Sequence, residues 1–412
     1  MSTRSPVHDP SGTLPQQPVR GNGLPLSALL ALATAVFVTS LTETLPAGVL
    51  PALGADLGVG ESAAGQAVTV YAVGTALTAI PLTAATAAWR RKRLLLSATG
   101  AFAVANTVTA VSSSYPLTLA ARFLAGVAAG LAWALLAGYA RRLTPVHLQG
   151  RAIAIVMTGI PVALSLGVPA GTFLAGATDW RVAFLAMTAL ALVVIGWTAA
   201  AVPDLPGQPP ERRERVLGAL AVPGVVPVLF VTLVFVLAHT VLYAYVASYL
   251  DHLGMGGSTD LVLLVFGVAS LAGIWVTGAL IHRRLRVLTV AGAVLVAAAA
   301  AVLGLLSDVP ALVYAAAALW GLGWGGVPTL LQTAVGDAGG ERADAAQAAL
   351  VTLWNAAMAG GGVLGGVLLD SAGAASLPWS VLVLLAPVLA VVLGARAHGF
   401  PAKRHGSPAE RA

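Results

Sequence analysis

The chain has 412 residues, of which 58% are hydrophobic and 9% are charged, with a formal net charge of +6 and no cysteine. Soluble domains carry about 25% charged residues, so this composition excludes a water-soluble globular protein and favours a membrane protein. The lack of cysteine excludes disulfides, thiolate chemistry and cysteine-ligated metal sites.

Twelve long apolar runs, separated by short polar breaks, follow one another along the chain. Each run is long enough to cross a bilayer, which takes about 20 apolar residues, and none alternates strictly as a barrel strand would. Because a spanning segment must satisfy its own backbone hydrogen bonds, we expect each run to be a helix. The expected spans are 26–50, 63–88, 94–112, 116–140, 151–176, 181–202, 219–249, 260–281, 287–306, 310–335, 344–369 and 377–397.

The predicted fold is therefore an all-α polytopic membrane protein with twelve transmembrane helices in two six-helix halves. A polar segment with four prolines and six charged residues, at 203–215, divides the halves. The first 23 residues are rich in Pro, Ser and Gly, which is typical of disorder. The expected parts are a cytoplasmic tail at 1–23, a first half at 24–202, a cytoplasmic linker at 203–218, a second half at 219–397 and a cytoplasmic tail at 398–412.

Basic residues occupy every second break between the predicted spans. All but two of the 22 Lys and Arg residues lie in these breaks or in the tails, and the exceptions are Arg122 and Arg181. The intervening breaks hold Arg181 with Asp56, Glu61, Asp179, Asp251, Asp260, Asp308 and Asp370. Basic residues near span ends are retained on the cytoplasmic side, so we expect both termini in the cytoplasm. Anionic lipid is the expected neighbour of the basic clusters, rather than nucleic acid.

The two predicted halves resemble each other at a nearly constant offset. The matched segments are 89–93 with 282–286, 126–130 with 321–325 and 167–171 with 362–366, at offsets of 193, 195 and 195 residues. Halves of six spans repeated in parallel are typical of alternating-access carriers, whose halves rock about a central site.

Three ionisable side chains lie well inside predicted spans: Glu43, Arg122 and His239. A buried arginine costs about 2.5–3.5 kcal/mol on insertion scales, so it needs a partner or a wet cavity. At 1.5 Å per residue, Glu43 in span 1 and Arg122 in span 4 lie about 12 and 9 Å below the same outer surface, so they can pair if these helices are neighbours. One interpretation is a fixed ion pair that pins the two spans, and the other is a switch that opens when Glu43 takes up a proton.

His239 in span 7 is followed by Tyr243, Tyr245 and Tyr249. One interpretation is a histidine hydrogen-bonded between helices, with tyrosines at the membrane interface. The other is a wall of the substrate cavity, whose aromatic surface suits planar apolar ligands.

Span 5 carries two prolines and three glycines within 13 residues: Gly159, Pro161, Gly167, Pro169 and Gly171. Small residues are frequent at membrane helix contacts. The cluster predicts a kinked helix that slides closely against its counterpart in the repeat, span 11.

These segments resemble the major facilitator superfamily over nearly the whole chain, and within it the twelve-span drug:proton antiporters of the chloramphenicol-resistance and arabinose-efflux-like branch. Span 5 is similar to the Gly/Pro motif that marks exporters in that family. The segment from Arg122 to Gly126 resembles its Arg-x-x-x-Gly motif, and the segment around Glu43 resembles its acidic first-span motif. The stretch beginning at Trp320, and Asn355 in span 11, also look like this branch.

The resemblance implies roles for particular residues. Proton coupling is expected of Glu43 and Arg122, and the antiporter motif is expected to comprise the five span 5 residues. Candidates for the substrate cavity are His239, Tyr243, Trp324, Gln332 and Asn355. One departure concerns the loop after span 2, where the family pattern has an acid that the segment 81–89 lacks.

The expected function is export of a small amphipathic molecule or drug in exchange for protons, by a monomer in the bacterial cytoplasmic membrane. A proton-coupled importer or sugar facilitator on the same fold is the alternative, and a non-transporting membrane sensor is a further one. No phosphate loop, metal-spaced His/Glu set or catalytic triad is present. We therefore expect neither an enzyme nor a cofactor, but a small-molecule substrate, protons and the lipid bilayer as partners.

Overall fold

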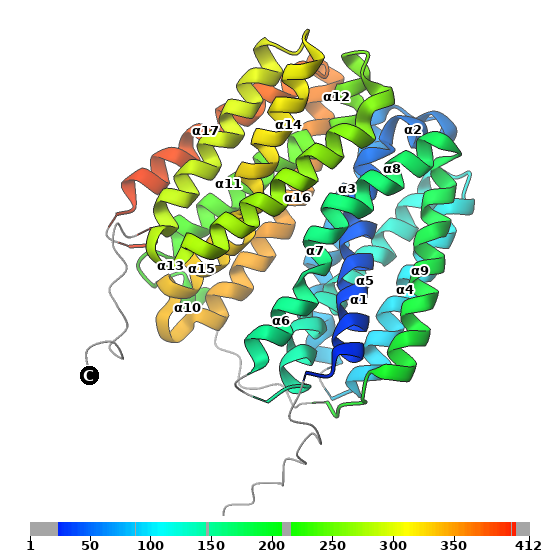
Figure 1. Cartoon of the computed structure of the whole chain (residues 1–412), viewed down its shortest axis with the longest axis vertical. Helices are drawn as coiled ribbons and strands as arrows, with labels where there is room; N and C mark the ends of the chain where they lie inside the picture. The colour runs from blue at the N-terminus through cyan, green and yellow to red at the C-terminus, as the bar shows by residue number, and fades with distance from the viewer. Residues whose placement is uncertain (1–23, 87, 146–147, 208–215, 397, 401–412) are drawn as a thin grey trace, which may run out of the picture.

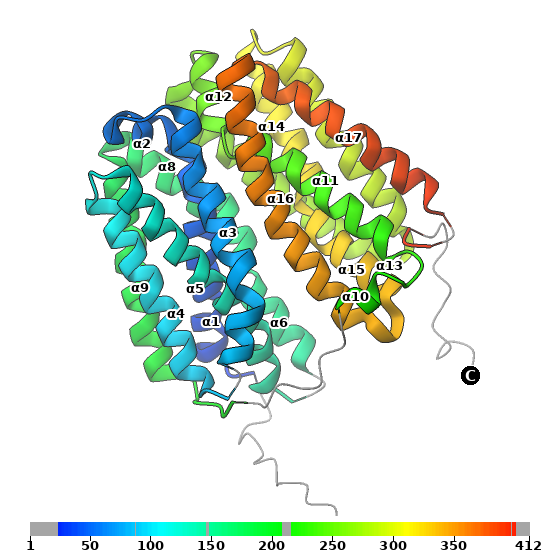
Figure 2. The same cartoon turned by 180° about the vertical axis from the view of Figure 1, so that it is seen from behind.

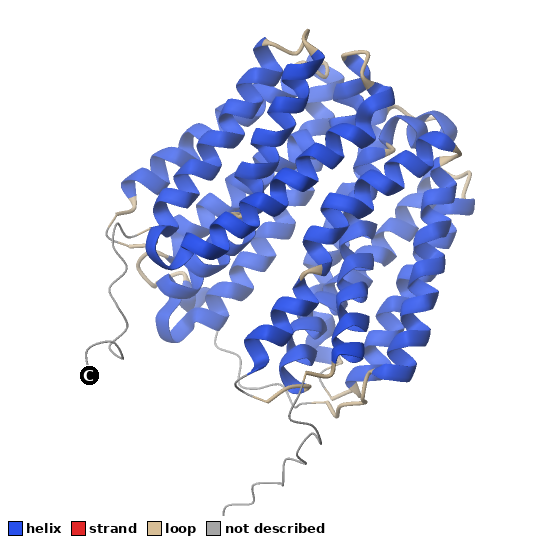
Figure 3. Cartoon of the chain, in the orientation of Figure 1, coloured by secondary structure: helices blue, strands red, loops and turns tan. Residues whose placement is uncertain are grey.

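The computed structural model describes residues 24–86, 88–145, 148–207, 216–396 and 398–400, and every regular element within these ranges is a helix (Figure 3). Two bundles lie side by side, one from each half of the chain (Figures 1 and 2). The first contains α1 (Leu26–Gly48), α2 (Leu50–Leu57), α3 (Glu61–Ala85), α4 (Arg91–Val111), α5 (Tyr115–Arg142), α6 (Gln149–Met157), α7 (Gly159–Val162), a π-helical turn (Ala163–Gly167), α8 (Val168–Ala177) and α9 (Trp180–Ala201). The second contains α10 (Val216–Ala219), α11 (Val225–Tyr243), α12 (Val246–His252), α13 (Thr259–Leu305), α14 (Pro310–Gly325), α15 (Val327–Gly339), α16 (Ala343–Ala372) and α17 (Ser376–Gly394).

The spanning helices agree with the predicted fold class. Within the described ranges, 11 helices are long and apolar enough to cross a membrane. Helix α3, with 25 residues, runs beside them and makes the twelfth (Figure 2). Spans 8 and 9 share the label α13, which turns sharply at Arg284, where φ is −136° and ψ is 28°.

Several spans differ in detail from the prediction. Span 7 begins at Val225 rather than at 219, because the turn at Pro223–Gly224, with φ of 95° at Gly224, ends the short helix α10 before it. Span 1 is interrupted at Val49, and span 7 is interrupted after Tyr243. The linker and both tails lie largely outside the described residues, so the domain boundaries stay predictions.

The internal repeat is visible in how the glycines pack. A Cβ on Gly126 of α5 would lie 2.0 Å from the carbonyl oxygen of Tyr71 on α3. A Cβ on Gly321 of α14 would lie 2.1 Å from the carbonyl oxygen of Phe266 on α13. Both the glycines and their partners are 195 residues apart. The same close crossing of two helix backbones is thus built twice.

With the termini in the cytoplasm as predicted, the two bundles pack together mainly through α3 with α16 and through the π-turn and α8 with α13, and the outer part of α1 also takes part. The first half of α1, up to Val38, packs into the core of its own bundle. Beyond Leu41, its apolar residues join the core of the second bundle. Toward the opposite end, where α6 and α10 lie, the two bundles diverge (Figure 1).

The pairing of helices across the interface corrects one expectation. Span 11 (α16) packs against α3, while the π-turn and α8 of span 5 pack against α13. The prediction that span 5 slides against span 11 is therefore wrong. The repeat instead pairs span 5 with span 8 and span 11 with span 2, since parallel repeats place equivalent helices on opposite sides of the interface.

Candidate transport site

Arg122 connects three helices of the first bundle. Its side chain is completely enclosed, and Nη2 donates a 2.7 Å hydrogen bond to the carbonyl oxygen of Thr42 on α1. Nε donates at 3.4 Å to the carbonyl oxygen of Ala67 on α3. The guanidinium carbon lies 5.0 Å from the ring centroid of Tyr71, within cation–π range. Nη1 has no hydrogen-bond partner, so one donor of a buried cation is unused.

Glu43, which is half-buried, is near Arg122 but does not form a direct ion pair with it. Helices α1 and α5 pack together, and the two charges are close enough to interact. No N···O distance of 4.0 Å or less joins them. Ion pairs among the described residues include Arg90–Asp204 and Arg181–Asp56. The carboxylate therefore lies beside the guanidinium, whose hydrogen bonds go to backbone carbonyls.

Asn106 of α4 is a buried polar residue of this site that the sequence analysis did not single out. It is fully enclosed, and its Nδ2 donates a 3.2 Å hydrogen bond to Oγ1 of Thr42. Its Oδ1 has no partner. The amide within the apolar run at 94–112 was the available signal, because an unpaired amide in a membrane helix is costly.

A cluster of aromatic rings surrounds His239 in the second bundle. The imidazole stacks on the indole of Trp324, with ring centroids 3.6 Å apart and planes inclined by 5°. Nε1 of Trp320 donates a 3.1 Å hydrogen bond to Nδ1 of His239. The His239 cluster consists of Phe235, His239, Tyr243, Phe266, Trp320, Trp324 and Trp354.

The cluster contains three of the five residues that the resemblance assigned to the cavity: His239, Tyr243 and Trp324. Gln332 is exposed on α15, and no contact links it to the rings. Asn355 follows Trp354 on α16, but its Nδ2 donates to the carbonyl oxygen of Val351 in its own helix, at 2.9 Å.

Two further rings of the cluster, Trp320 and Phe266, were not predicted as cavity residues, although the sequence contains evidence for both. Trp320 stands in a motif already noted. Phe266 lies 195 residues after Tyr71, the ring beside Arg122, so the repeat itself points to its position.

The two groups of residues approach each other across the bundle interface. Tyr243 on α11 lies close to the side chains of Thr44 and Glu43 on α1. The Tyr243 ring lies 5.1 Å from that of His239. Tyr243 therefore stands between the acidic site of the first bundle and the aromatic cluster of the second.

The Gly/Pro series of span 5 forms a broken helix packed against α1. The π-helical turn Ala163–Gly167 lies between Pro161 and Pro169, neither of which has a backbone donor. A Cβ on Gly159 would lie 2.3 Å from the carbonyl oxygen of Ala33. Those on Gly167 and Gly171 would meet side chains of α1 at 2.8 and 2.6 Å. These glycines thus let span 5 approach α1 closely.

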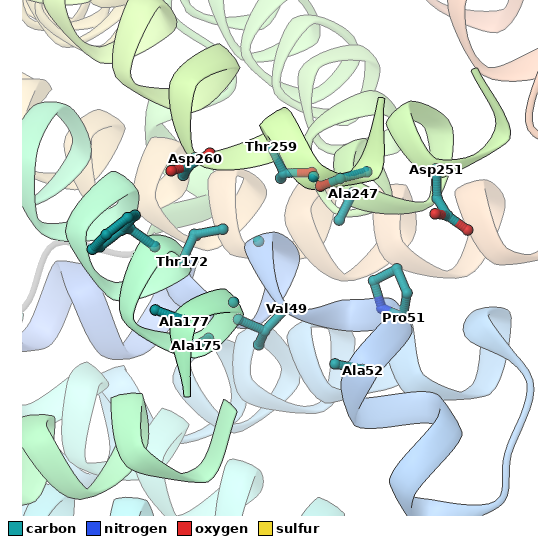
Figure 4. Close-up of a pocket in the computed structure, with 15 residues that line it drawn as sticks. Val49, Pro51, Ala52, Thr172, Ala175, Ala177, Ala247, Asp251, Thr259 and Asp260 are labelled. Carbon is teal, nitrogen blue, oxygen red and sulfur yellow. The ribbon is translucent and has the colours of Figure 1, made fainter. Parts of the chain in front are cut away.

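A pocket of about 450 Å³ lies where the outer ends of the bundles meet (Figure 4). Its lining includes Val49, Pro51, Thr172, Asp251 and Asp260. None of the predicted site residues lines it. In the described part of the chain no group of three or more His, Cys, Asp or Glu side chains could hold a metal ion.

Comparison with known proteins decides the family. The model of the Major Facilitator Superfamily matches residues 32–362. The chain belongs to this superfamily. Membership confirms the resemblance and the predicted fold, and it makes the chain a membrane transporter rather than an enzyme.

Three individual proteins illustrate the similarity. The transcription regulatory protein OpdE of Pseudomonas aeruginosa is 31% identical over 379 residues, which are 90% of this chain and 94% of that protein. The purine ribonucleoside efflux pump NepI of Escherichia coli is 28% identical over 356 residues, 85% of this chain and 89% of the pump. A D-xylose–proton symporter structure has a TM-score of 0.75 at 14% identity, over 93% of this chain and all of the symporter, which shows a common fold.

Proposed function

We propose that this transporter exports a small, planar, amphipathic molecule in exchange for protons by alternating access. The observation that carries the proposal is the position of Tyr243, which lies close to Thr44 and Glu43 and also contacts His239, so that a titratable site and an aromatic surface meet across the bundle interface. A carrier needs both sites, and their contact offers a route by which occupancy of one changes the other.

The proton is carried by Glu43 in this proposal. When ionised, the carboxylate is stabilised by Arg122, whose Nη1 has an unused donor. When protonated, Glu43 loses that attraction, and α1 is then held to Arg122 by the hydrogen bond to the Thr42 carbonyl oxygen without the help of charge. One proton moving inward across 100 mV yields about 2.3 kcal/mol, which drives the substrate outward. The gradient is the energy source, and no cofactor takes part.

Export rather than import is supported by two features. The Gly/Pro series of span 5 resembles the antiporter motif, and NepI, a relative at 28% identity, is an efflux pump by name. The alternation of basic breaks supports cytoplasmic termini in a bacterial cytoplasmic membrane. With that orientation the bundles are closed on the outside, so the described conformation faces inward and is ready to load a substrate.

Purine ribonucleosides are the first substrates to test. Their rings are planar, as the His239 cluster would require, and aromatic stacking contributes about 0.5–1.5 kcal/mol beyond area burial. A monomer is expected to suffice, since both sites lie within one chain.

The alternatives are a proton-coupled importer or sugar facilitator and a membrane sensor. The xylose symporter shares the fold alone, and the regulatory name of OpdE belongs to that protein.

Transport by the purified chain in proteoliposomes separates these functions. We expect an imposed pH gradient to drive counter-movement of radiolabelled adenosine or inosine, and substrate addition to release protons without a gradient. Accumulation of xylose but not nucleosides would support the importer. Absence of transport across a panel of nucleosides, sugars and amphipathic drugs would support the sensor.

A further inference from the structure

We infer that Trp320 is a positioning residue that holds His239 in the tautomer protonated at Nε2, so that the imidazole presents a hydrogen-bond donor to the substrate. This inference rests on the proposed function for the site, and it specifies the chemistry of the ligand: a planar heteroaromatic ring with a hydrogen-bond acceptor in its plane.

The first step concerns which nitrogen of His239 carries the proton. An indole N–H can only donate, so the 3.1 Å bond from Trp320 Nε1 makes Nδ1 of His239 the acceptor. A nitrogen that accepts carries no proton. The neutral imidazole must then carry its single proton on Nε2.

The second step concerns what Nε2 can reach. No hydrogen bond to Nε2 is present in the described chain, and Nε2 is not among the enclosed atoms that lack a partner. His239 retains 8% exposure, whereas its neighbour Phe266 retains 2%. The free edge of the imidazole, which carries Nε2, therefore keeps some accessible surface.

The third step concerns orientation. The imidazole plane is nearly parallel to that of the Trp324 indole, with the ring centroids 3.6 Å apart, so the imidazole cannot tilt without losing that stack. Stacking fixes the plane of the ring, and the Trp320 bond fixes its rotation within that plane. Nε2–H is thus aimed in one direction before any ligand arrives, which lowers the entropic cost of binding.

A ligand that uses this donor must offer a lone pair in the plane of a flat ring. Ring nitrogens of a purine do so, and a carbon analogue of the same shape does not. When a carbon replaces the ring nitrogen, the Nε2–H donor loses its acceptor and the complex loses roughly one hydrogen bond. We therefore expect the carbon analogue to bind about three- to tenfold more weakly than the purine.

The direct test is nitrogen-15 NMR of the histidine-labelled chain in lipid nanodiscs, with the His239 signals assigned by their loss in His239→Gln. We expect wild type to show the Nε2–H tautomer. Trp320→Phe should show a mixture of both tautomers, because it keeps a ring but loses the donor. Trp275→Phe is the matched control, since Trp275 is 77% exposed and takes no part in the ring contacts of the cluster. A wild-type Nδ1–H tautomer, or an unchanged spectrum in Trp320→Phe, would overturn the inference.

The ligand test compares adenosine with its 1-deaza, 3-deaza and 7-deaza analogues. Wild type should bind one of the analogues about three- to tenfold more weakly than adenosine, and Trp320→Phe should reduce that preference. Equal weakening of all four ligands would mean that Trp320 only packs, against the inference. If no nucleoside binds while the tautomer is as expected, the substrate proposal fails and the positioning role stands.

Discussion

Buried polar side chains in this chain are held by neutral acceptors, which are backbone carbonyls for Arg122 and an imidazole nitrogen for Trp320. Arg122 bonds to the carbonyls of Thr42 and Ala67, and the indole of Trp320 bonds to a neutral imidazole nitrogen. A cation held this way is anchored without being neutralised. It can then respond to a carboxylate that gains or loses a proton, which a fully paired cation could not do.

At the same scale, the exposed pair Arg90–Asp204 provides a pH-dependent contribution to stability. Partial burial raises the pKa of Asp204, but the hydrogen bond and charge of Arg90 and the N–H of Lys92 outweigh burial and hold that pKa below its usual range. A depressed folded-state pKa means that the stabilisation is present above the unfolded pKa of about 3.9 and is lost as pH falls through the folded value.

Asp204→Asn should therefore lower the thermal unfolding midpoint at pH 7 slightly, by an amount equivalent to less than about 1 kcal/mol, because Arg90 is exposed and solvent screens the pair. The difference between variant and wild type should shrink at acidic pH, as the pH falls through the folded-state pKa of Asp204. Thermal scans of the purified chain at pH 7 and at acidic pH measure this. A larger difference at low pH than at pH 7 would contradict the assignment.

At the scale of elements, glycines decide how closely helices approach. In span 5, Gly159 faces backbone atoms of α1, whereas Gly167 and Gly171 face side chains. Backbone cannot move aside as a side chain can. Adding a Cβ should therefore destabilise the protein more at Gly159 than at Gly167 or Gly171.

Gly159→Ala should reduce both transport and thermal stability, with an overpacking cost of about 1–3 kcal/mol. Gly176→Ala is the matched control in the same span, because a Cβ there meets no atom within 4 Å. Transport assays and thermal scans of both variants measure the effect. Wild-type behaviour of Gly159→Ala would show that the close approach to α1 is incidental.

Much of the element layout followed from sequence, and the reasons are local. Runs of apolar residues predicted the twelve spans, and the offset of 195 residues matched the segments of Gly126 and Gly321, which the structure packs in the same way. The partner of span 5 was not predictable, because periodicity gives a helix its faces but not its neighbours. At the candidate site, Arg122 and His239 stood out in the sequence as rare ionisable residues inside spans, whereas Phe266 looked like any apolar residue until the repeat aligned it with Tyr71.

At the scale of the whole molecule, closure of the outer end depends on Tyr245 of the second bundle. Its hydroxyl donates 2.8 Å to the carbonyl oxygen of Gly362 and lies 3.3 Å from that of Ser62 in the first bundle. A Cβ on Gly65 would lie 2.3 Å from the Tyr245 ring. The Tyr245 ring therefore packs directly on Gly65, in a slot that any larger residue at position 65 would fill.

Gly65→Ala should keep the outer end from closing fully and shift the population toward an outward-open state. A cysteine at Ala247, which lines the outer pocket, should then react faster with an impermeant thiol reagent. Gly60→Ala is the control, since a Cβ there meets nothing within 4 Å. Equal labelling rates in the two variants would argue against the slot as a determinant of closure.

Topology can be tested on the same cysteine-free background. A cysteine at Ser113, between α4 and α5, should be labelled from outside intact cells, because it lies in a break that lacks basic residues. A cysteine at Ser407, which lies outside the described residues, should be labelled only after lysis. Labelling of Ser407 in intact cells would contradict cytoplasmic termini.

Proton coupling through Glu43 is the central claim for the molecule. The alternative is that Glu43 and Arg122 only hold α1 against α5. Glu43→Gln distinguishes the two, because it keeps the shape and polarity of the side chain but cannot ionise. Arg122→Ala removes the hydrogen bonds to two backbone carbonyls, so it should impair folding as well as proton coupling. It therefore cannot separate the two roles as Glu43→Gln does.

The most direct measurement is substrate-induced proton release from the chain in proteoliposomes, compared between wild type and Glu43→Gln, with substrate binding measured alongside. We expect wild type to release protons on substrate addition, and Glu43→Gln to bind substrate with no release. Undiminished proton release in Glu43→Gln would contradict the account and reduce Glu43 to a structural contact.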